Sequence, residues 1–207
     1  MTASPRSRAA AQIQDAAWEI LAERGLPGVT MEEIAARAGV AKTTVYRWWP
    51  TKSAVLMDAL RERLLPRVAF PEDGSVRDDL VSQIEAVIDL FGSETGRAYL
   101  ALVAESMHDG EVATALRERY VDDQRRAAIE RLEKGKRKGE VLPEVDLELL
   151  VDSLYGALYY RVLVSHAPLD RAYARRLVDG IWPGEPNRRR PAGDDGAGPS
   201  TAEASMI

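Results

Sequence analysis

Residues 30–56 read TMEEIAARAGVAKTTVYRWWPTKSAVL, and this stretch decides the fold. Thr30, followed three residues later by Glu33, is typical of a capping box at the start of a helix. Gly39 is expected to end that helix, because glycine adopts the left-handed conformation of helix ends most easily. A second short helix is predicted over Lys42–Trp48 and ends before the proline that follows. The stretch therefore predicts two short helices joined by a tight turn, which is helix-turn-helix geometry.

The second helix of this pair has an apolar side and a polar side. Val45 and Trp49 are predicted to be buried, because four residues separate them and both then lie on one face of the helix. In helix-turn-helix proteins the second helix enters the major groove of duplex DNA, so the opposite side would make the contacts. The side chains predicted on that outer side are Lys42, Thr43, Thr44, Tyr46, Arg47 and Trp48.

The residue types on the outer side suit contacts with DNA. Lys42 can donate hydrogen bonds to guanine acceptors, and Thr43 can place its methyl group against thymine or its hydroxyl against a base. Hydroxyl and ammonium groups can bind phosphate oxygens, and at a helix start the free backbone N–H groups assist them. The candidates for phosphate contacts are Thr30, Thr44, Tyr46 and Lys52.

The composition fits a folded protein. Hydrophobic residues make up 45% of the 207 residues, and no apolar run approaches the roughly 20 residues of a membrane helix. The chain has no cysteine, which removes disulfides and thiolate zinc sites, and a cytoplasmic location is the simplest expectation. The net charge is −5, but residues 1–60 contain seven Lys or Arg against six Asp or Glu. A DNA-binding protein needs positive charge at its contact face rather than over the whole chain.

Helical periodicity recurs along the chain and strand-like alternation is missing, so we predict an all-α fold. Outside the motif, helices are predicted over Pro5–Arg24, 51–65, 96–107, 110–138 and 169–181, with two more that begin near 75 and 146. A break rich in proline and glycine at 70–74 favours a domain boundary there. The expected organisation is a helix-turn-helix domain over 1–65, a second helical domain over 66–183 and a disordered tail over 184–207.

A set of short elements within residues 9–57 resembles the DNA-binding domain of the TetR family of bacterial regulators. The elements are Thr30 with Ile34-Ala35, Ala38-Gly39-Val40, Thr44-Val45-Tyr46, Trp49, and Lys52 with Ala54-Val55-Leu56. The segment VSHAPLD at residues 164–170 also resembles a C-terminal domain of actinobacterial members. Two residues depart from the family pattern: Trp48 stands where His or Tyr is commoner, and Trp49 stands where Phe is usual.

This resemblance implies an all-helical homodimer that binds double-stranded DNA and responds to a small-molecule effector. The first three helices would bind DNA, and the helices of residues 66–183 would form a ligand pocket and the dimer interface. The resemblance assigns base reading to Lys42 and Thr43, and mainly phosphate contacts to Thr44, Tyr46, Trp48 and Lys52. For Trp48, packing against Tyr46 or the first helix stays open as an alternative. Most such proteins are repressors, so the expected function is a ligand-responsive repressor that binds a near-palindromic operator.

Aromatic and apolar side chains in the C-terminal half suit a pocket for a small apolar ligand. Plain core packing is the alternative for each of these residues. The apolar stripes of the last two helices are equally available to an internal core and to a four-helix dimer interface. The candidates for lining the pocket are Phe91, Leu102, Met107, Tyr120, Tyr155 and Tyr159.

No catalytic, cofactor or metal site is predicted. His108 and His166 lack partners at metal-ligand spacing, and Ser106 with His108 and Asp109 looks like a helix end rather than a catalytic triad. The basic run at 134–138 is interpreted as the solvated end of a helix, with a nucleic-acid patch as the alternative. The arginines at 188–190 belong to the expected tail, where added DNA affinity is an open alternative. The rival classes are a helical enzyme, which would need a pocket with convergent acid, base or metal groups, and a protein-interaction module, which would show no salt-dependent DNA binding.

Overall fold

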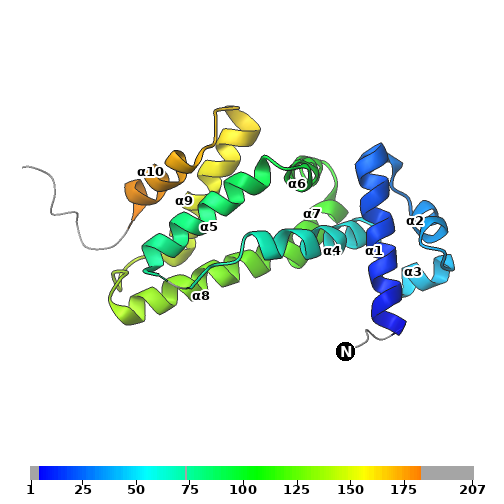
Figure 1. Ribbon diagram of the computed structural model, residues 1–207, viewed down its shortest axis with the longest axis horizontal. Helices are drawn as coiled ribbons and strands as arrows, with labels where there is room; N and C mark the ends of the chain where they lie inside the picture. The colour runs from blue at the N-terminus through cyan, green and yellow to red at the C-terminus, as the bar shows by residue number, and fades with distance from the viewer. Residues whose placement is uncertain (1–4, 73, 183–207) are drawn as a thin grey trace, which may run out of the picture.

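The computed structural model describes residues 5–72 and 74–182, and these ranges are all-helical, as predicted (Figure 1). The N-terminal helices are α1 (Pro5–Arg24), α2 (Met31–Arg37), α3 (Lys42–Trp48) and α4 (Lys52–Leu64). The C-terminal helices are α5 (Val76–Phe91), α6 (Glu94–Glu105), α7 (Gly110–Leu116), α8 (Asp122–Lys138), α9 (Leu147–Tyr159) and α10 (Arg171–Ile181). Two 3-10 turns (Leu26–Gly28 and Leu65–Arg67) and two π-helical turns (Arg117–Val121 and Tyr160–Val164) complete the helical elements. The predicted tail, 184–207, lies outside the described residues.

The helix α4 joins the two ends of an elongated molecule. Figure 1 shows α1, α2 and α3 at one end and α5, α8, α9 and α10 at the other, with α4 extending between them. One side of α4 packs against α1, and it also packs against α6, α7 and the π turn Arg117–Val121. Buried residues of both ends form one continuous hydrophobic cluster. A movement in either end therefore has to be accommodated by α4.

Apolar side chains at helical spacing build the core of the N-terminal end. Ile13 of α1, Ile34 of α2 and Val45 of α3 are fully buried. Trp49, which follows α3 directly, is also buried. Since each helix uses one face for this core, α2 and α3 keep their opposite faces toward solvent.

One of the two hydrogen bonds of the predicted capping box is present at the start of α2. The Thr30 hydroxyl accepts a hydrogen bond from the Glu33 backbone N–H at 3.1 Å, and Thr30 has the extended conformation of an N-cap. The reciprocal half of the prediction is wrong, because the Glu33 carboxylate instead accepts a hydrogen bond from the Arg24 guanidinium at 3.1 Å. This ion pair ties the start of α2 to the end of α1.

The corner between α5 and α6 differs from the prediction that the sixth helix covers 96–107. The helix begins at Glu94, because the Ser93 hydroxyl caps it by accepting from the Gly96 N–H at 3.1 Å. Gly96 itself contacts the end of α5 so closely that an added Cβ would lie 1.9 Å from the Leu90 carbonyl oxygen. Only glycine fits this approach. The helix then ends at Glu105, earlier than predicted.

The predicted helix 110–138 is continuous but not uniform. Helices α7 and α8 are joined without a break by the π turn Arg117–Val121. A second π turn, Tyr160–Val164, follows α9. A π turn widens the helix locally and rotates the side chains that follow, and such turns are frequent at functional sites. Both π turns lie next to the cavity described below.

A buried ion pair joins α5 to α8. Arg131 Nε donates to Asp79 Oδ2 at 2.7 Å, and both side chains are almost fully buried. The other carboxylate oxygen of Asp79 accepts from the Gly74 N–H at 3.1 Å, and the Arg131 guanidinium donates to the Gly74 carbonyl at 3.1 Å. The pair thus organises the chain that leads into α5.

Within the described part of the chain, no helix combines the length and hydrophobicity needed to cross a membrane.

Replacement of Thr30 by Ala is expected to lower the free energy of unfolding by about 1 kcal/mol, because the Glu33 N–H loses its cap. Thr30→Ser keeps the hydroxyl and is the matched control, with a loss below about 0.5 kcal/mol. Urea denaturation followed by circular dichroism measures both. Equal stability of Thr30→Ala and the parent chain would contradict the cap.

Candidate DNA interface and ligand cavity

The turn between α2 and α3 is built by backbone hydrogen bonds around one glycine. Gly39 has a φ of +65°, in the left-handed region, and no neighbour restricts its Cα. The Val40 N–H donates to the Ala35 carbonyl at 3.0 Å, and the Gly39 N–H donates to the Ala36 carbonyl at 3.2 Å. These bonds close the end of α2 and set the direction in which α3 leaves.

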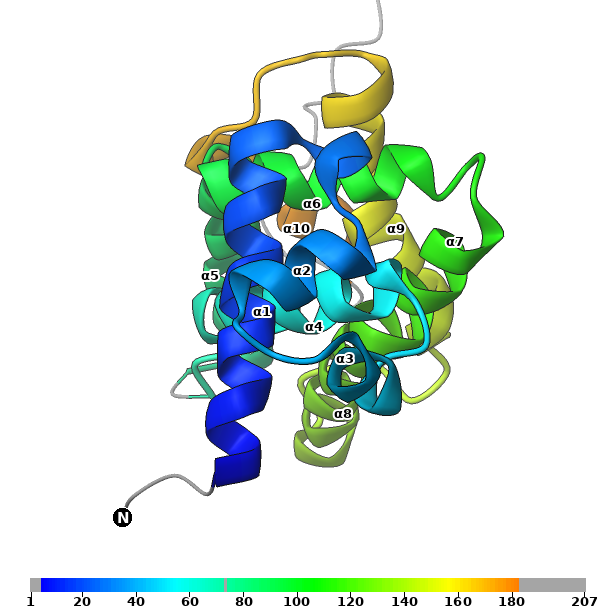
Figure 2. The ribbon, with the colours of Figure 1, turned by 90° about the vertical axis from the view of Figure 1, so that its right-hand side faces the viewer.

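The outer side of α3 is exposed at the tip of the molecule. Figure 2 views this end directly and shows α1, α2 and α3 in front of the C-terminal helices. Lys42, Thr43 and Arg47 are exposed, and Tyr46 is 45% exposed. Thr44 and Trp48 are half-buried. The side that the sequence assigns to DNA is therefore accessible, whereas Val45 on the opposite side is fully buried.

Lys42, the predicted base-reading residue, has an intramolecular partner. Its ammonium contacts the carboxylate of Glu32 in α2 and lies 5.5 Å from the centre of the Tyr46 ring. The hydrogen bond to Glu32 raises the pKa of Lys42, and the same bond lowers the pKa of Glu32. Both side chains are exposed, so water can replace this contact at little cost. Lys42 can therefore exchange Glu32 for a base edge.

Lys52 and Thr30, two predicted phosphate-binding residues, both lie at helix starts. Lys52 is the first residue of α4, which is capped by the Thr51 hydroxyl accepting from the Ala54 N–H at 3.2 Å. The Lys52 side chain is half-buried and lines a shallow cleft beside Glu105 and Asp109, without an ion pair to the described residues. The hydroxyl of Thr30 is used by its cap.

The two tryptophans at the end of α3 differ in role. Trp48 meets Trp49 edge to face, with ring centroids 5.7 Å apart, and the Arg47 guanidinium lies 5.3 Å from the centre of a Trp48 ring. The sequence left open that Trp48 packs against Tyr46 or the first helix. The contact with Trp49 is a further packing partner. Trp49 is buried, and its indole Nε1 donates to Asp58 Oδ2 of α4 at 2.6 Å.

Asp58 joins the end of α3 to the C-terminal helices. Besides Trp49, the same carboxylate oxygen accepts from Arg119 Nη1 at 2.8 Å, and Arg119 belongs to the π turn between α7 and α8. Arg61, one turn further along α4, donates to Asp123 of α8 at 2.8 Å, and this bond lowers the pKa of Asp123. Sequence reasoning missed this junction, because its partners lie about 60 residues apart and no local pattern links them.

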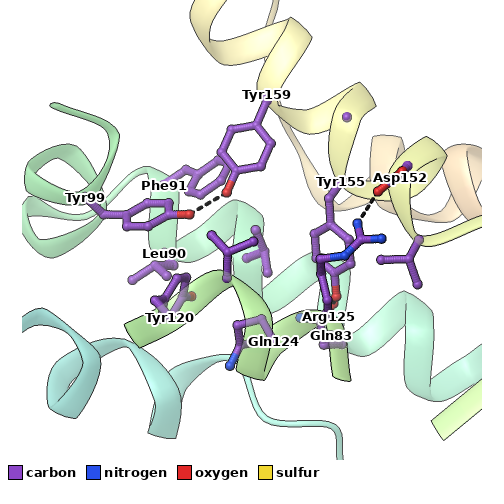
Figure 3. A pocket seen from close by; sticks show the side chains of 14 residues that line it. Gln83, Leu90, Phe91, Tyr99, Tyr120, Gln124, Arg125, Asp152, Tyr155 and Tyr159 are labelled. Atoms are coloured by element: carbon purple, nitrogen blue, oxygen red, sulfur yellow. Dashed lines mark hydrogen bonds and ion pairs between the residues drawn. The ribbon is translucent and has the colours of Figure 1, made fainter. Parts of the chain in front are cut away.

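A cavity of about 360 Å³ lies among α5, α6, α8 and α9. Figure 3 shows its wall, with Tyr99, Phe91, Tyr159 and Tyr120 gathered toward one side and Tyr155, Arg125 and Asp152 toward the other. The full lining consists of Gln83, Val87, Leu90, Phe91, Tyr99, Tyr120, Val121, Gln124, Arg125, Val151, Asp152, Tyr155, Gly156 and Tyr159.

Four of the six predicted pocket residues line this cavity, and two do not. Phe91, Tyr120, Tyr155 and Tyr159 form part of its wall, whereas Leu102 is buried in the core away from it. The prediction for Met107 is wrong, since its side chain is 80% exposed. The reason is the early end of α6 at Glu105, which turns the following residues outward. The sequence analysis missed Tyr99, Gln83, Gln124 and Arg125, whose helical positions alone do not separate them from ordinary core or surface residues.

The phenol groups of the cavity are uncharged. Burial raises the pKa of Tyr99, Tyr120, Tyr155 and Tyr159 above the ordinary value of a phenol. The hydroxyls of Tyr99 and Tyr159 share a hydrogen bond of 2.5 Å, and the Tyr155 hydroxyl donates to Gln83 Oε1 at 2.9 Å. These bonds satisfy three of the four hydroxyls within the wall itself.

The rival sites weighed from the sequence have structural explanations. Asp109 caps α7 by accepting from the backbone N–H groups of residues 111 and 112, and the Ser106 hydroxyl donates to the Val103 carbonyl at 2.6 Å. No group of three or more His, Asp or Glu side chains that could hold a metal ion occurs among the described residues. In the basic run, Lys134 binds Glu72 and Lys136 donates to two backbone carbonyls, as expected for a helix end.

An exposed polar helix on a helix-turn-helix places this chain among the DNA-binding transcription regulators. Residues 13–59 match the family model for bacterial regulatory proteins of the tetR family, and residues 70–181 match the model for a tetracyclin repressor-like C-terminal domain. The chain belongs to the TetR family of bacterial transcription regulators.

Several relatives of this chain are named as transcription regulators. YdeS of Bacillus subtilis strain 168, an uncharacterized HTH-type transcriptional regulator, is 34% identical over 172 residues, which cover 83% of this chain and 87% of YdeS. The DNA-binding transcriptional repressor TetR of Mycobacteroides abscessus is 27% identical over 185 residues, covering 87% of this chain and 95% of that repressor. The crystal structure of the TetR family transcription regulator SCO0332 matches with a TM-score of 0.74 at 35% identity, covering 84% and 96% of the two chains. These relatives are regulators and not enzymes.

Proposed function

We propose that this regulator binds a near-palindromic DNA operator as a homodimer, represses transcription there, and leaves the operator when a small molecule occupies its cavity. The observation that carries the proposal is the exposed polar side of α3, held at the tip of the molecule by a buried opposite side. The 27%-identical relative named as a repressor supports the sign of regulation. Two copies of α3 spaced about 34 Å apart, one helical turn of DNA, would read two half-sites.

An apolar stripe on α9 and the π turn after it supports the dimer. Leu149 is 64% exposed, Val164 is 63% exposed, and the exposed Tyr160 lies between them. The small residue Ser153, one turn after Leu149, is exposed and would let a second helix approach closely. Pairing α9 and α10 of two copies would form a four-helix interface that removes these side chains from water.

The Asp58 junction supports coupling between the cavity and α3. Tyr120 lines the cavity, and its chain neighbour Arg119 binds Asp58 of α4. Asp58 in turn binds Trp49 at the end of α3. A ligand that changes the π turn would change the ion pair at Asp58, and α4 would act as a lever that alters the spacing of the two recognition helices.

Two lysine substitutions are expected to weaken DNA binding in different ways. Lys52→Ala should lower affinity for every duplex and reduce the slope of log K against log salt by about one, because one phosphate contact is lost. Lys42→Ala should cost about 1–3 kcal/mol only on the preferred sequence and relax the preference at one base pair. Fluorescence anisotropy over a salt series, on duplexes selected from a random pool by the purified protein, measures both.

Matched controls separate charge from side-chain shape. Lys52→Arg should keep the salt slope, and Glu32→Gln should strengthen binding to the selected duplex, because it removes the carboxylate that competes for Lys42. Failure of the parent chain to bind any duplex, or an unchanged slope for Lys52→Ala, would argue against the proposed interface.

The dimer is tested by placing a charge on the apolar stripe. Val164→Glu should raise the dimer dissociation constant by about tenfold or more, because a carboxylate buried at an interface without a partner is costly. Ala104→Glu, at an exposed position of α6, is the control and should leave the assembly unchanged. Sedimentation velocity reports the masses, and a monomeric parent chain or a fully dimeric Val164→Glu variant would count against the stripe as the interface.

The coupling is tested by a double-mutant cycle for DNA affinity. Arg119→Gln should weaken DNA binding about fivefold, although Arg119 lies outside the helix-turn-helix, because the end of α3 loses its support through Asp58. In an Asp58→Asn background the same substitution should have no further effect. Arg117→Gln is the control, since Arg117 lies on the same π turn but pairs with Glu118 and Asp122. Additive effects of the two substitutions on DNA affinity would contradict coupling through the Arg119–Asp58 ion pair.

A further inference from the structure

The two charged residues of the cavity lining are paired with each other. Arg125 and Asp152 are the charged residues of its lining, and the Arg125 guanidinium contacts the carboxylates of both Asp152 and Glu148. The hydrogen bond to Asp152 raises the pKa of Arg125, which keeps the cation in this contact. An ionic ligand would lose its hydration in the apolar part of the cavity, whereas the two carboxylates that share Arg125 are more than 60% exposed and stay in contact with water. The lining therefore favours an uncharged molecule.

The wall of the cavity is mainly apolar and aromatic. The rings of Tyr99 and Tyr120 meet edge to face with centroids 5.1 Å apart, and Phe91 and Tyr159 lie 5.7 Å apart. Rings in such arrangements present both faces and edges to the cavity, and contact with a further ring is energetically favourable. An aromatic ligand would thus continue a packing pattern that the wall already has.

One hydroxyl of the wall has no hydrogen-bond partner. Tyr120 is only 6% exposed and lines the cavity, yet its hydroxyl forms no hydrogen bond with the described residues. The hydroxyl oxygen is not among the described polar atoms that are both buried and without a partner, so it opens on the cavity, where a group inside the cavity can bind it. Gln124, one helical turn further along, also lines the cavity and has no side-chain partner among the described residues. Both residues come from the helix segment around the π turn.

We propose that the cavity binds an uncharged aromatic molecule that carries one hydrogen-bonding group, and that the Tyr120 hydroxyl binds this group. The inference rests on the proposed ligand control and adds the chemical class of the ligand. It also places the contact at a defined point: Tyr120 lies in the π turn next to Arg119, which binds Asp58. A ligand bond to Tyr120 thus acts on the residue beside the interdomain ion pair.

Four probes of the same ring system test the class. The full-length protein is titrated by calorimetry at neutral pH with 2-naphthol, naphthalene, 2-naphthoate and 2-naphthylmethylammonium. We expect 2-naphthol to bind, naphthalene to bind about tenfold more weakly because it lacks the hydroxyl, and both ions to bind at least about a hundredfold more weakly.

Two tyrosine variants test the assigned contact. Tyr120→Phe removes only the hydroxyl and should weaken 2-naphthol binding about tenfold while leaving naphthalene unchanged. Tyr173→Phe is the matched control, because it removes the hydroxyl of a tyrosine on α10 that does not line the cavity, and it should change 2-naphthol binding less than about threefold. Thermal melts of both variants verify that they fold.

The outcomes separate this inference from the proposed regulation. Absence of 2-naphthol binding, tighter binding of either ion, or an unchanged 2-naphthol affinity in folded Tyr120→Phe would overturn the ligand class or the contact. DNA affinity is measured on the same samples with and without 2-naphthol. Binding that depends on Tyr120 but leaves DNA affinity unchanged supports the ligand class and contradicts control of DNA binding through this cavity.

Discussion

The carboxylate of Asp58 accepts hydrogen bonds from two groups that belong to opposite ends of the molecule. Trp49 donates from the end of the recognition helix, and Arg119 donates from the π turn that borders the cavity. The carboxylate is partly buried, so the loss of either donor would raise its free energy, because water cannot fully replace the lost hydrogen bond. Neither end can therefore shift along α4 without a change in free energy at this one oxygen. The proposed coupling of DNA binding to the cavity depends on this constraint.

The N-terminal half was predictable because its signals are local. The hydroxyl of Thr30 caps a backbone group three residues away, and the left-handed conformation of Gly39 depends on its own lack of a side chain. The range predicted for α3, Lys42–Trp48, is the observed one. The exposure of its polar side followed from periodicity alone, since the buried positions of Val45 and Trp49 leave only one face for solvent.

The C-terminal half was predicted as helices, but its cavity was predicted only in part, because the cavity depends on contacts distant in sequence. Periodicity predicts that Tyr155 is on an inner face, but not that Gln83, 72 residues earlier, accepts its hydrogen bond. Met107 was misplaced for a smaller reason, since the helix ends two residues before it. The π turn Arg117–Val121 is a further feature that periodicity did not predict, since the sequence indicated one uniform helix over 110–138.

The presence of tyrosine at position 120 is not explained by packing. Its neighbours Leu90 and Tyr99 are almost fully buried, and their side chains line the same cavity. Phenylalanine would fill the same space, whereas tyrosine presents to the cavity a hydroxyl that no described residue binds. A molecule with a ring and a hydrogen-bonding group would contact the aromatic wall and bind this hydroxyl. The proposed ligand class thus gives a reason for tyrosine rather than phenylalanine at this position.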